Sequence, residues 1–253
     1  MTDGMNSPLS LSELESYFSD DYFHFDEIIH PAETSERQVG AIWELLSLAP
    51  GNSVLDLGCG YGRIANRLAI KGARVAGLDI SPALLKKAKL DAAQSGVDVE
   101  YVLGDMRSLP WRDQFDAAFL WYTSFGCFDD ADNERVLCEA ASSLRDGGRL
   151  LIDSTNPFAA LCHDWPVYRL VQRNDDLRFD VWENDALTGR RHCEKILVRN
   201  GSVARMHFSY RQYGFAEYDR MLRNVGFRAV EAYGEEGRAF TSYDPRLLVV
   251  ARK

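Results

Sequence analysis

The sequence has no apolar run that approaches the roughly 20 residues a membrane-spanning helix needs. Its first ten residues lack the basic start and apolar stretch of a signal peptide. Cysteine is sparse: the five residues are scattered, odd in number and without a C-x-x-C pair, which argues against a disulfide framework or a zinc site. These absences predict a cytoplasmic protein with reduced thiols, without a bound metal and without a membrane partner.

Basic residues are in deficit. Lys and Arg number 29 against 38 Asp and Glu, which gives a formal net charge of −9. An acidic surface repels phosphate backbones, so we do not expect a nucleic-acid partner. Hydrophobic residues make up 46% of the 253 residues, enough for one large α/β domain. We therefore expect a single domain that acts on a small molecule, and the sequence leaves open whether it forms a homo-oligomer.

Short apolar runs alternate with helical patterns along most of the chain. This alternation indicates a parallel sheet with helices on both faces. After an interruption the pattern resumes with a helix over 215–224 and strands over 227–233 and 246–251. The earlier expected strands are 53–57, 74–78, 99–103, 115–121 and 149–153, and the earlier expected helices are 33–48, 63–70, 82–95 and 134–144.

Two segments stand outside the alternation. Residues 161–213 predict an antiparallel insertion, with strands over 177–183, 191–199 and 202–213 and a tight Asn200-Gly201 turn. Residues 1–40 predict a helical N-terminal cap, in which residues 11–29 are both acidic and aromatic. We expect the insertion to cover the acceptor site and the cap to act as a lid.

Residues 54–63 read V-L-D-L-G-C-G-Y-G-R and are the most informative segment. A strand that runs through glycines into a helix brings backbone N–H groups close to a ligand. The spacing is G-x-G-x-G, and Arg63 stands where a dinucleotide-binding G-x-G-x-x-G turn has its third glycine. Asp56 would oppose a pyrophosphate but suits a positively charged ligand. A tight turn without a ligand is the alternative.

Two further acidic residues follow the next two expected strands. Asp79 ends the second strand, where a carboxylate can accept both hydrogens of a ribose diol. Asp105 ends the third strand, where it can accept from an adenine amino group while Met106 packs against the ring. Each acid alone is typical of a loop or a helix cap. Because all three acids lie at the carboxyl edge, where open α/β sheets bind ligands, their conjunction favours a bound ligand.

With these residues in place, the chain resembles the class I S-adenosylmethionine-dependent methyltransferases. The resemblance spans residues 53–253 and rests on VLDLGCGYGR, GLDIS, GDMRSLP, FDAAFL and LRDGGRLLID in the family's order. It implies S-adenosylmethionine as the cofactor and a Rossmann-like sheet of seven strands with the last strand antiparallel. The implied cofactor-binding residues are Asp56, Gly58, Cys59, Gly60 and Gly62 at the methionine part, Asp79, Ile80, Gly104, Asp105 and Met106 at ribose and adenine, and Leu120 and Trp121 at the methionine amino group.

The segment after the fourth strand narrows the acceptor. Residues 120–126 lack the Asn/Asp-Pro-Pro-aromatic motif of enzymes that methylate adenine or glutamine amides, and no Pro-Cys nucleophile of cytosine methylation is present. The N-terminal aromatics, the SFGCFDD stretch and the insertion resemble bacterial small-molecule N-methyltransferases of antibiotic and sugar biosynthesis, such as those of lincosamide pathways. This resemblance implies methyl transfer to an amine nitrogen of a secondary metabolite by positioning.

On the acceptor side, alternatives stay open. Tyr17 and Tyr22 are candidate catalytic residues because aromatic rings can face the sulfonium and a cationic acceptor, although packing of the first helix explains them equally well. An O- or C-methyltransferase would need a base in reach. The candidates for that base are His207 and, in the same two segments, His24, His30 and His163.

Two other functions compete with methyl transfer. A nucleotide-dependent oxidoreductase is one, and the G-x-G-x-G spacing together with Asp56 argues against it. A non-catalytic S-adenosylmethionine-binding module is the other, and a filled or open cofactor edge would favour it.

Overall fold

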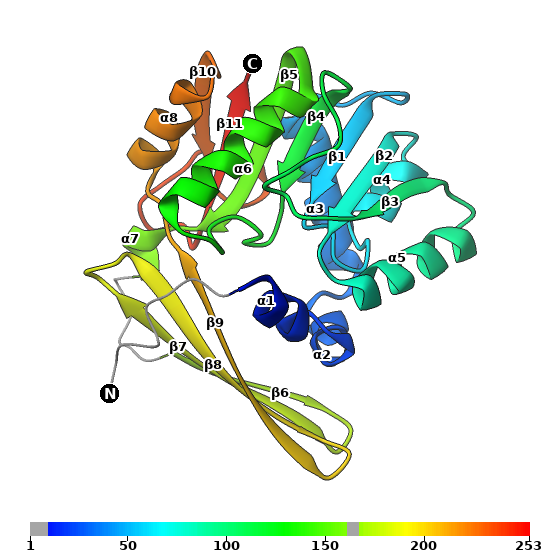
Figure 1. The fold of residues 1–253 in the computed structure, drawn as a ribbon, viewed down its shortest axis with the longest axis vertical. Coiled ribbons are helices and arrows are strands. Elements are labelled where there is room, and N and C mark those ends of the chain that lie inside the picture. Colours follow the sequence, from blue (N-terminus) through cyan, green and yellow to red (C-terminus); the bar gives the residue numbers. More distant parts are fainter. Residues whose placement is uncertain (1–9, 161–166) are drawn as a thin grey trace.

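The computed structural model describes residues 10–160 and 167–253 (Figure 1). Its main body is a seven-stranded sheet with the strand order β10-β11-β5-β4-β1-β2-β3. Strands β1 to β5 are parallel, and β11 runs antiparallel to both of its neighbours. The predicted Rossmann-like sheet with an antiparallel last strand is confirmed. The strands are β1 (Ser53–Leu57), β2 (Arg74–Asp79), β3 (Val99–Leu103), β4 (Phe115–Leu120), β5 (Leu144–Thr155), β10 (Ala229–Tyr233) and β11 (Arg246–Arg252).

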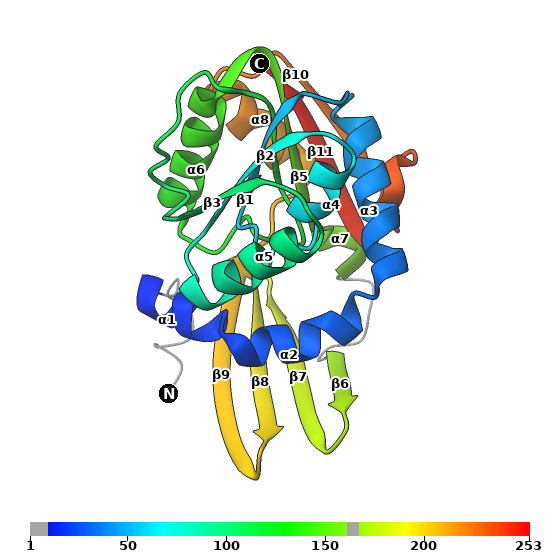
Figure 2. The same ribbon diagram turned by 90° about the vertical axis from the view of Figure 1, so that its right-hand side faces the viewer.

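Helices cover both faces of this sheet (Figure 2). Side chains alternate along the buried strands, so Val54 packs into the core below one group of helices while Leu55 and Leu57 pack into the core below the other. Ser81 accepts a hydrogen bond from the Leu84 amide and begins α5, as predicted. The first group is α3 (Ala32–Leu45), α4 (Ala65–Ile70) and α5 (Pro82–Gln94), and the second is α6 (Asp130–Ser143) and α8 (Phe215–Asn224). No helix in the described part of the chain combines the length and apolar character that crossing a bilayer requires.

The insertion forms a separate antiparallel sheet of four strands in the order β6-β7-β8-β9. Asn200 and Gly201 both have positive φ, at 50° and 75°, which confirms the predicted turn between β8 and β9. Sequence analysis found three of these strands and missed β6, an edge strand whose exposed and buried residues do not alternate. The strands are β6 (Val167–Arg173), β7 (Asp176–Asp185), β8 (Arg190–Arg199) and β9 (Ser202–Arg211), preceded by the short helix α7 (Pro157–Ala160).

The N-terminal cap contains two helices before the first one expected from sequence, α1 (Leu11–Tyr17) and α2 (Asp20–Ile29). Ser10 and Glu13 form a capping box at the start of α1. This Ser-x-x-Glu spacing is visible in the sequence, and it would have predicted the helix. The two helices lie between the carboxyl edge of the main sheet and the insertion sheet (Figures 1 and 2). The cap therefore contacts both parts of the molecule.

Gly62 offers a test of how the turn after β1 packs. Its φ is +76°, and a Cβ there would overlap the hydroxyl of Tyr101, which donates to Asn66 Oδ1 at 2.7 Å. Gly62→Ala should lose about 1–2 kcal/mol of unfolding free energy from the strained backbone and about 1–3 kcal/mol more from overpacking. Urea denaturation measures both, and Gly96→Ala is the matched control because its φ is +67° with no atom within 4 Å. Equal losses in the two variants would contradict the packing role.

Candidate cofactor and acceptor site

A cavity lies at the carboxyl edge of β1, β2, β3 and β4, and the side chains of Leu14, Phe18 and Tyr22 from the cap close it on the opposite side. Ten of the twelve predicted cofactor residues line it. Leu120 does not line it and is fully buried in the core. Gly62 does not line it either, because it faces Tyr101 within the protein. The ten are Asp56, Gly58, Cys59, Gly60, Asp79, Ile80, Gly104, Asp105, Met106 and Trp121.

The glycine turn presents backbone to this cavity. Gly58 and Gly60 have φ of +76° and +54°, conformations that L side chains rarely adopt. A Cβ built on Gly60 would meet nothing nearer than Leu84 at 4.0 Å, whereas one on Gly58 would lie 2.9 Å from Ser124. The turn at Gly60 thus leaves room for a ligand that touches the main chain.

Two buried carboxylates stand beside this turn. Asp56 is 3% exposed and Asp79 is 7% exposed. Burial raises the pKa of both groups, and for Asp56 the neighbouring Asp79 adds to the rise. Asp79 accepts hydrogen bonds from the amides of Gly60 (2.7 Å) and Ser81 (2.8 Å), which partly oppose that effect. A positively charged ligand would favour the ionised form of both carboxyls, so the site suits a cation.

At the other end of the cavity, Asp105 is already engaged. Burial acts to raise the pKa of Asp105, but hydrogen bonds from Arg107 outweigh it and leave the pKa lowered. Arg107 Nη2 donates to Asp105 Oδ2 at 2.7 Å, and the guanidinium stacks 4.3 Å from the ring centroid of Phe128. Asp105 would therefore accept from an adenine amino group while it also accepts from Arg107, and Met106 and Phe128 supply the apolar wall.

The chain turns sharply after β4. Tyr122 and Thr123 both have positive φ, at 56° and 65°, and each such residue carries about 1–3 kcal/mol of strain. Asp153 holds the turn: its carboxylate accepts from the Tyr122 amide at 2.9 Å and its carbonyl from the Thr123 amide at 3.2 Å. Arg246 donates to Asp153 Oδ1 at 2.8 Å and to Thr123 Oγ1 at 3.1 Å. These hydrogen bonds from Tyr122, Thr123 and Arg246 hold the turn, together with Trp121, in the cavity wall.

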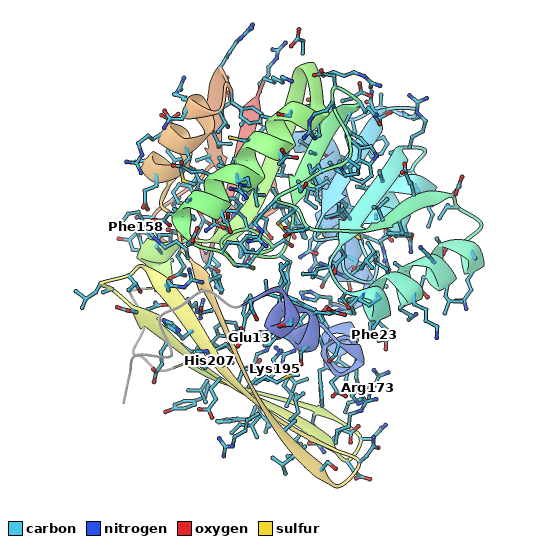
Figure 3. The ribbon with its side chains drawn as sticks, viewed as in Figure 1. Glu13, Phe23, Phe158, Arg173, Lys195 and His207 are labelled. Carbon is cyan, nitrogen blue, oxygen red and sulfur yellow. The ribbon has the colours of Figure 1, made fainter. Side chains whose placement is uncertain are left out.

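The structure separates the three predicted catalytic residues. Tyr22 lines the cavity. Tyr17 is not among the described lining residues; its ring stacks on Phe208 at 4.7 Å. His207 lies on β9 beside His192, with ring centroids 5.8 Å apart, and is likewise absent from the described lining (Figure 3). Tyr17 and His207 therefore lie outside the described cavity lining, and of the three predicted residues Tyr22 is the one within it.

The other three candidate bases, His24, His30 and His163, differ in their position relative to the cavity. His24 faces Asp176 on the insertion at 2.9 Å. His30 is buried, with its ring 4.2 Å from that of Tyr122, which lines the cavity. His163 lies outside the described residues.

Two charged lining residues were missed by the sequence analysis. Asp26, 4% exposed, accepts a hydrogen bond from the Tyr61 hydroxyl at 2.9 Å. Arg63 donates to Gln38 Oε1 at 2.6 Å and provides the positive charge in the described lining. Recognition of α2 would have found Asp26, because it lies one helical turn from Tyr22 on the same face.

Comparisons with known proteins agree with this geometry. A methyltransferase domain model matches residues 54–148. The ubiquinone biosynthesis O-methyltransferase of Marinobacter nauticus is 32% identical over 166 residues, which cover 58% of this chain and 69% of that protein. The chain spans only 43–44% of the length of several other curated methyltransferases that it matches.

Solved structures show the same fold. The CcbJ methyltransferase from Streptomyces caelestis aligns with a TM-score of 0.74 at 23% identity, over 86% of this chain and 89% of that one. The sugar N-methyltransferase KedS8 from Streptoalloteichus sp. aligns with a TM-score of 0.65 at 20% identity, over 88% and 87% of the two chains.

Fold and site together define an α/β enzyme with a candidate cofactor cavity at the carboxyl edge of the sheet. The chain belongs to the S-adenosylmethionine-dependent methyltransferases. This membership excludes the oxidoreductase alternative. The cavity fits the cofactor: the buried carboxylate of Asp56 suits its positive charge, that of Asp79 can accept from the ribose hydroxyls, and the Cβ position of Gly60 is open.

Asp79 carries the test of the cofactor site. We expect Asp79→Ala to weaken binding of S-adenosylmethionine by about 1.5–3 kcal/mol for each charge-assisted hydrogen bond lost. Calorimetry measures the affinity, and urea denaturation reports the accompanying loss of the Gly60 and Ser81 bonds. Asp116→Ala is the matched control, because Asp116 accepts from the Ser53 amide at 2.7 Å at the opposite edge of the sheet. If both folded variants bind the cofactor equally well, the assignment of Asp79 is wrong.

Proposed function

We propose that this enzyme methylates an amine nitrogen of a small molecule and relies on positioning instead of a strong base. The observation that carries the proposal is the buried carboxylate of Asp26, which the cap places in the same cavity as Asp56 and the glycine turn. A carboxylate attracts an ammonium acceptor and holds it near the cofactor. When bound, S-adenosylmethionine would supply a methyl group on a sulfonium sulfur, whose C–S bond is the one broken and whose thioether product, S-adenosylhomocysteine, is the leaving group.

The acceptor nitrogen forms one C–N bond and loses one proton in the overall reaction. Its lone pair must be free before attack, which requires loss of that proton to water or to a weak base. Burial raises the pKa of Asp26, so this carboxyl can take up a proton more readily than an exposed one. Tyr61 donates to Asp26 Oδ2 and orients the group.

A hydroxyl acceptor finds less support. It would need a base in the cavity wall, and His30 is the described histidine nearest to it. Burial lowers the pKa of His30 to about 3, so its ring is neutral but weakly basic. Its Nε2 lies 3.6 Å from Asp26 Oδ1, too far for a strong hydrogen bond.

The comparisons support a small-molecule acceptor and leave its reacting atom open. KedS8 is a sugar N-methyltransferase, whereas the relative from Marinobacter nauticus is an O-methyltransferase. Enclosure of the cofactor edge by the cap favours an enzyme over a binding module. In this proposal the sheet binds the cofactor, while the cap (residues 1–40) and the insertion (residues 161–213) enclose the acceptor. A role in a secondary-metabolite pathway and a cytoplasmic location stay predictions.

Asp26→Asn tests the proposal. We expect kcat/KM for amine acceptors to fall about 10- to 100-fold, the effect of losing one hydrogen bond to a charged group. In the unmodified enzyme the rate should rise with pH, first as Asp26 ionises through its raised pKa and then as the amine becomes neutral. Both ionisations increase the rate as the pH rises. Asp26→Asn should remove the increase that comes from Asp26 and keep the one that comes from the amine.

Asp21→Asn is the control, since Asp21 lies on the same helix and pairs with Arg199 outside the described cavity lining. A labelled-cofactor assay against a panel of amines and alcohols gives the rates. Unchanged kcat/KM in Asp26→Asn, or turnover with alcohols alone, would contradict an amine acceptor held by this residue.

A further inference from the structure

The inner face of the insertion sheet holds a buried excess of positive charge where it meets the cap. Arg178 is 6% exposed and Lys195 is 1% exposed, and Asp180, between them, is fully buried. Asp180 accepts from Nε and Nη2 of Arg178 at 2.7–2.9 Å. It also lies directly opposite Lys195 in the register of β7 and β8. One carboxylate on this sheet thus stands beside two cations.

Each cation keeps a donor without a hydrogen-bond partner among the described residues: Lys195 Nζ and Arg178 Nη1. Lys195 lies where the insertion sheet faces the cap (Figure 3). Its Nζ is 3.9 Å from the ring centroid of Tyr17 and 5.1 Å from that of Tyr22. Burial, followed by the charge of Arg178, lowers the pKa of Lys195 to about 7. A buried ammonium without a partner is costly, and a bound anion would remove that cost.

Tyr22 links these cations to the cofactor cavity, because its ring both adjoins Lys195 and lines the cavity. Asp26, one turn along the same helix, lines the cavity as well and interacts electrostatically with Arg178 and Lys195. The cap is held over the insertion by an ion pair between Arg173 and Glu27 at 2.9 Å. Asp26 therefore lines the cavity itself, whereas Lys195 adjoins it through the ring of Tyr22, and Arg178 lies beside Lys195 on the neighbouring strand.

We propose that the acceptor carries an anionic oxygen group, a carboxylate or a phosphate, and that Lys195 and Arg178 bind it behind Tyr22. This inference rests on the proposed function, in which Asp26 attracts the reacting amine. The complementary acceptor is a zwitterion, with its ammonium toward Asp26 and its anion toward Lys195. Such a ligand supplies the partner that the two orphaned donors lack.

The test measures binding to the enzyme loaded with S-adenosylhomocysteine, so it does not depend on turnover. Calorimetry compares phenylalanine with phenylalaninamide, and phosphoethanolamine with ethanolamine. We expect the anionic member of at least one pair to bind at least tenfold more tightly than its partner, and the pair that shows the preference identifies carboxylate or phosphate. Lys195→Met should abolish the preference and leave the affinity for S-adenosylhomocysteine unchanged.

Two further variants sharpen the outcome. Lys195→Arg retains the charge and should keep the preference, whereas Arg205→Met removes an exposed cation of β9 and should change nothing. The proposal is overturned if neither pair shows a preference, or if Lys195→Met keeps it. A Lys195→Met protein that loses both stability and cofactor affinity also overturns it, because the cation then only packs the cap. Failure of the unmodified enzyme to bind S-adenosylhomocysteine would count against the proposed function instead.

Discussion

The two hydrogen bonds that Asp79 accepts hold the cofactor edge together. One comes from the glycine turn after β1 and the other from the start of α5, so a single carboxylate at the end of β2 joins three elements. The Asp79 carboxyl is almost fully buried, and burial raises its pKa because it disfavours the ionised form. Asp79 therefore shapes the turn and also leaves the edge short of positive charge. A cationic cofactor corrects that shortage, which couples the local fold to the choice of ligand.

The cap connects the cofactor edge to the insertion sheet through side-chain hydrogen bonds and an ion pair. Ser81, next to the Asp79 site, donates its hydroxyl to the Phe18 carbonyl at 2.6 Å, and Tyr61 of the glycine turn donates to Asp26. On its other side α2 pairs with the insertion through Arg173 and Glu27. Because the cap is bonded to both bodies, its position fixes how groups on β7 and β8 lie relative to the cofactor turn. Under the proposed function, a change in the insertion would alter acceptor specificity through the cap and leave the cofactor edge intact.

The sequence predicted well which residues meet at the carboxyl edge of the sheet, because the arrangement of that edge follows from local rules. Parallel strands read as apolar runs, and their carboxyl ends must share an edge, so the predicted acids meet where the alternation places them. Gly62 lies outside the described cavity lining and faces Tyr101, which the sequence could not show, because a glycine required for packing looks the same in sequence as one that admits a ligand. The cap side of the cavity depends on tertiary contacts: Tyr17 and Tyr22 are alike in sequence, but in the structure Tyr17 stacks on Phe208 while Tyr22 lines the cavity.

In the proposed reaction, the distribution of buried charge would support methyl transfer to an amine without a strong base. As the new C–N bond forms, positive charge grows on the acceptor nitrogen, and a fixed carboxylate nearby stabilises that charge without reorganisation. Asp26 is placed for this by a helix that is itself anchored at Tyr61. A neutral, weakly basic His30 beside it adds no competing cation. The cations lie on the far side of Tyr22, where they repel the developing charge least and favour an acceptor oriented with its nitrogen toward the cofactor.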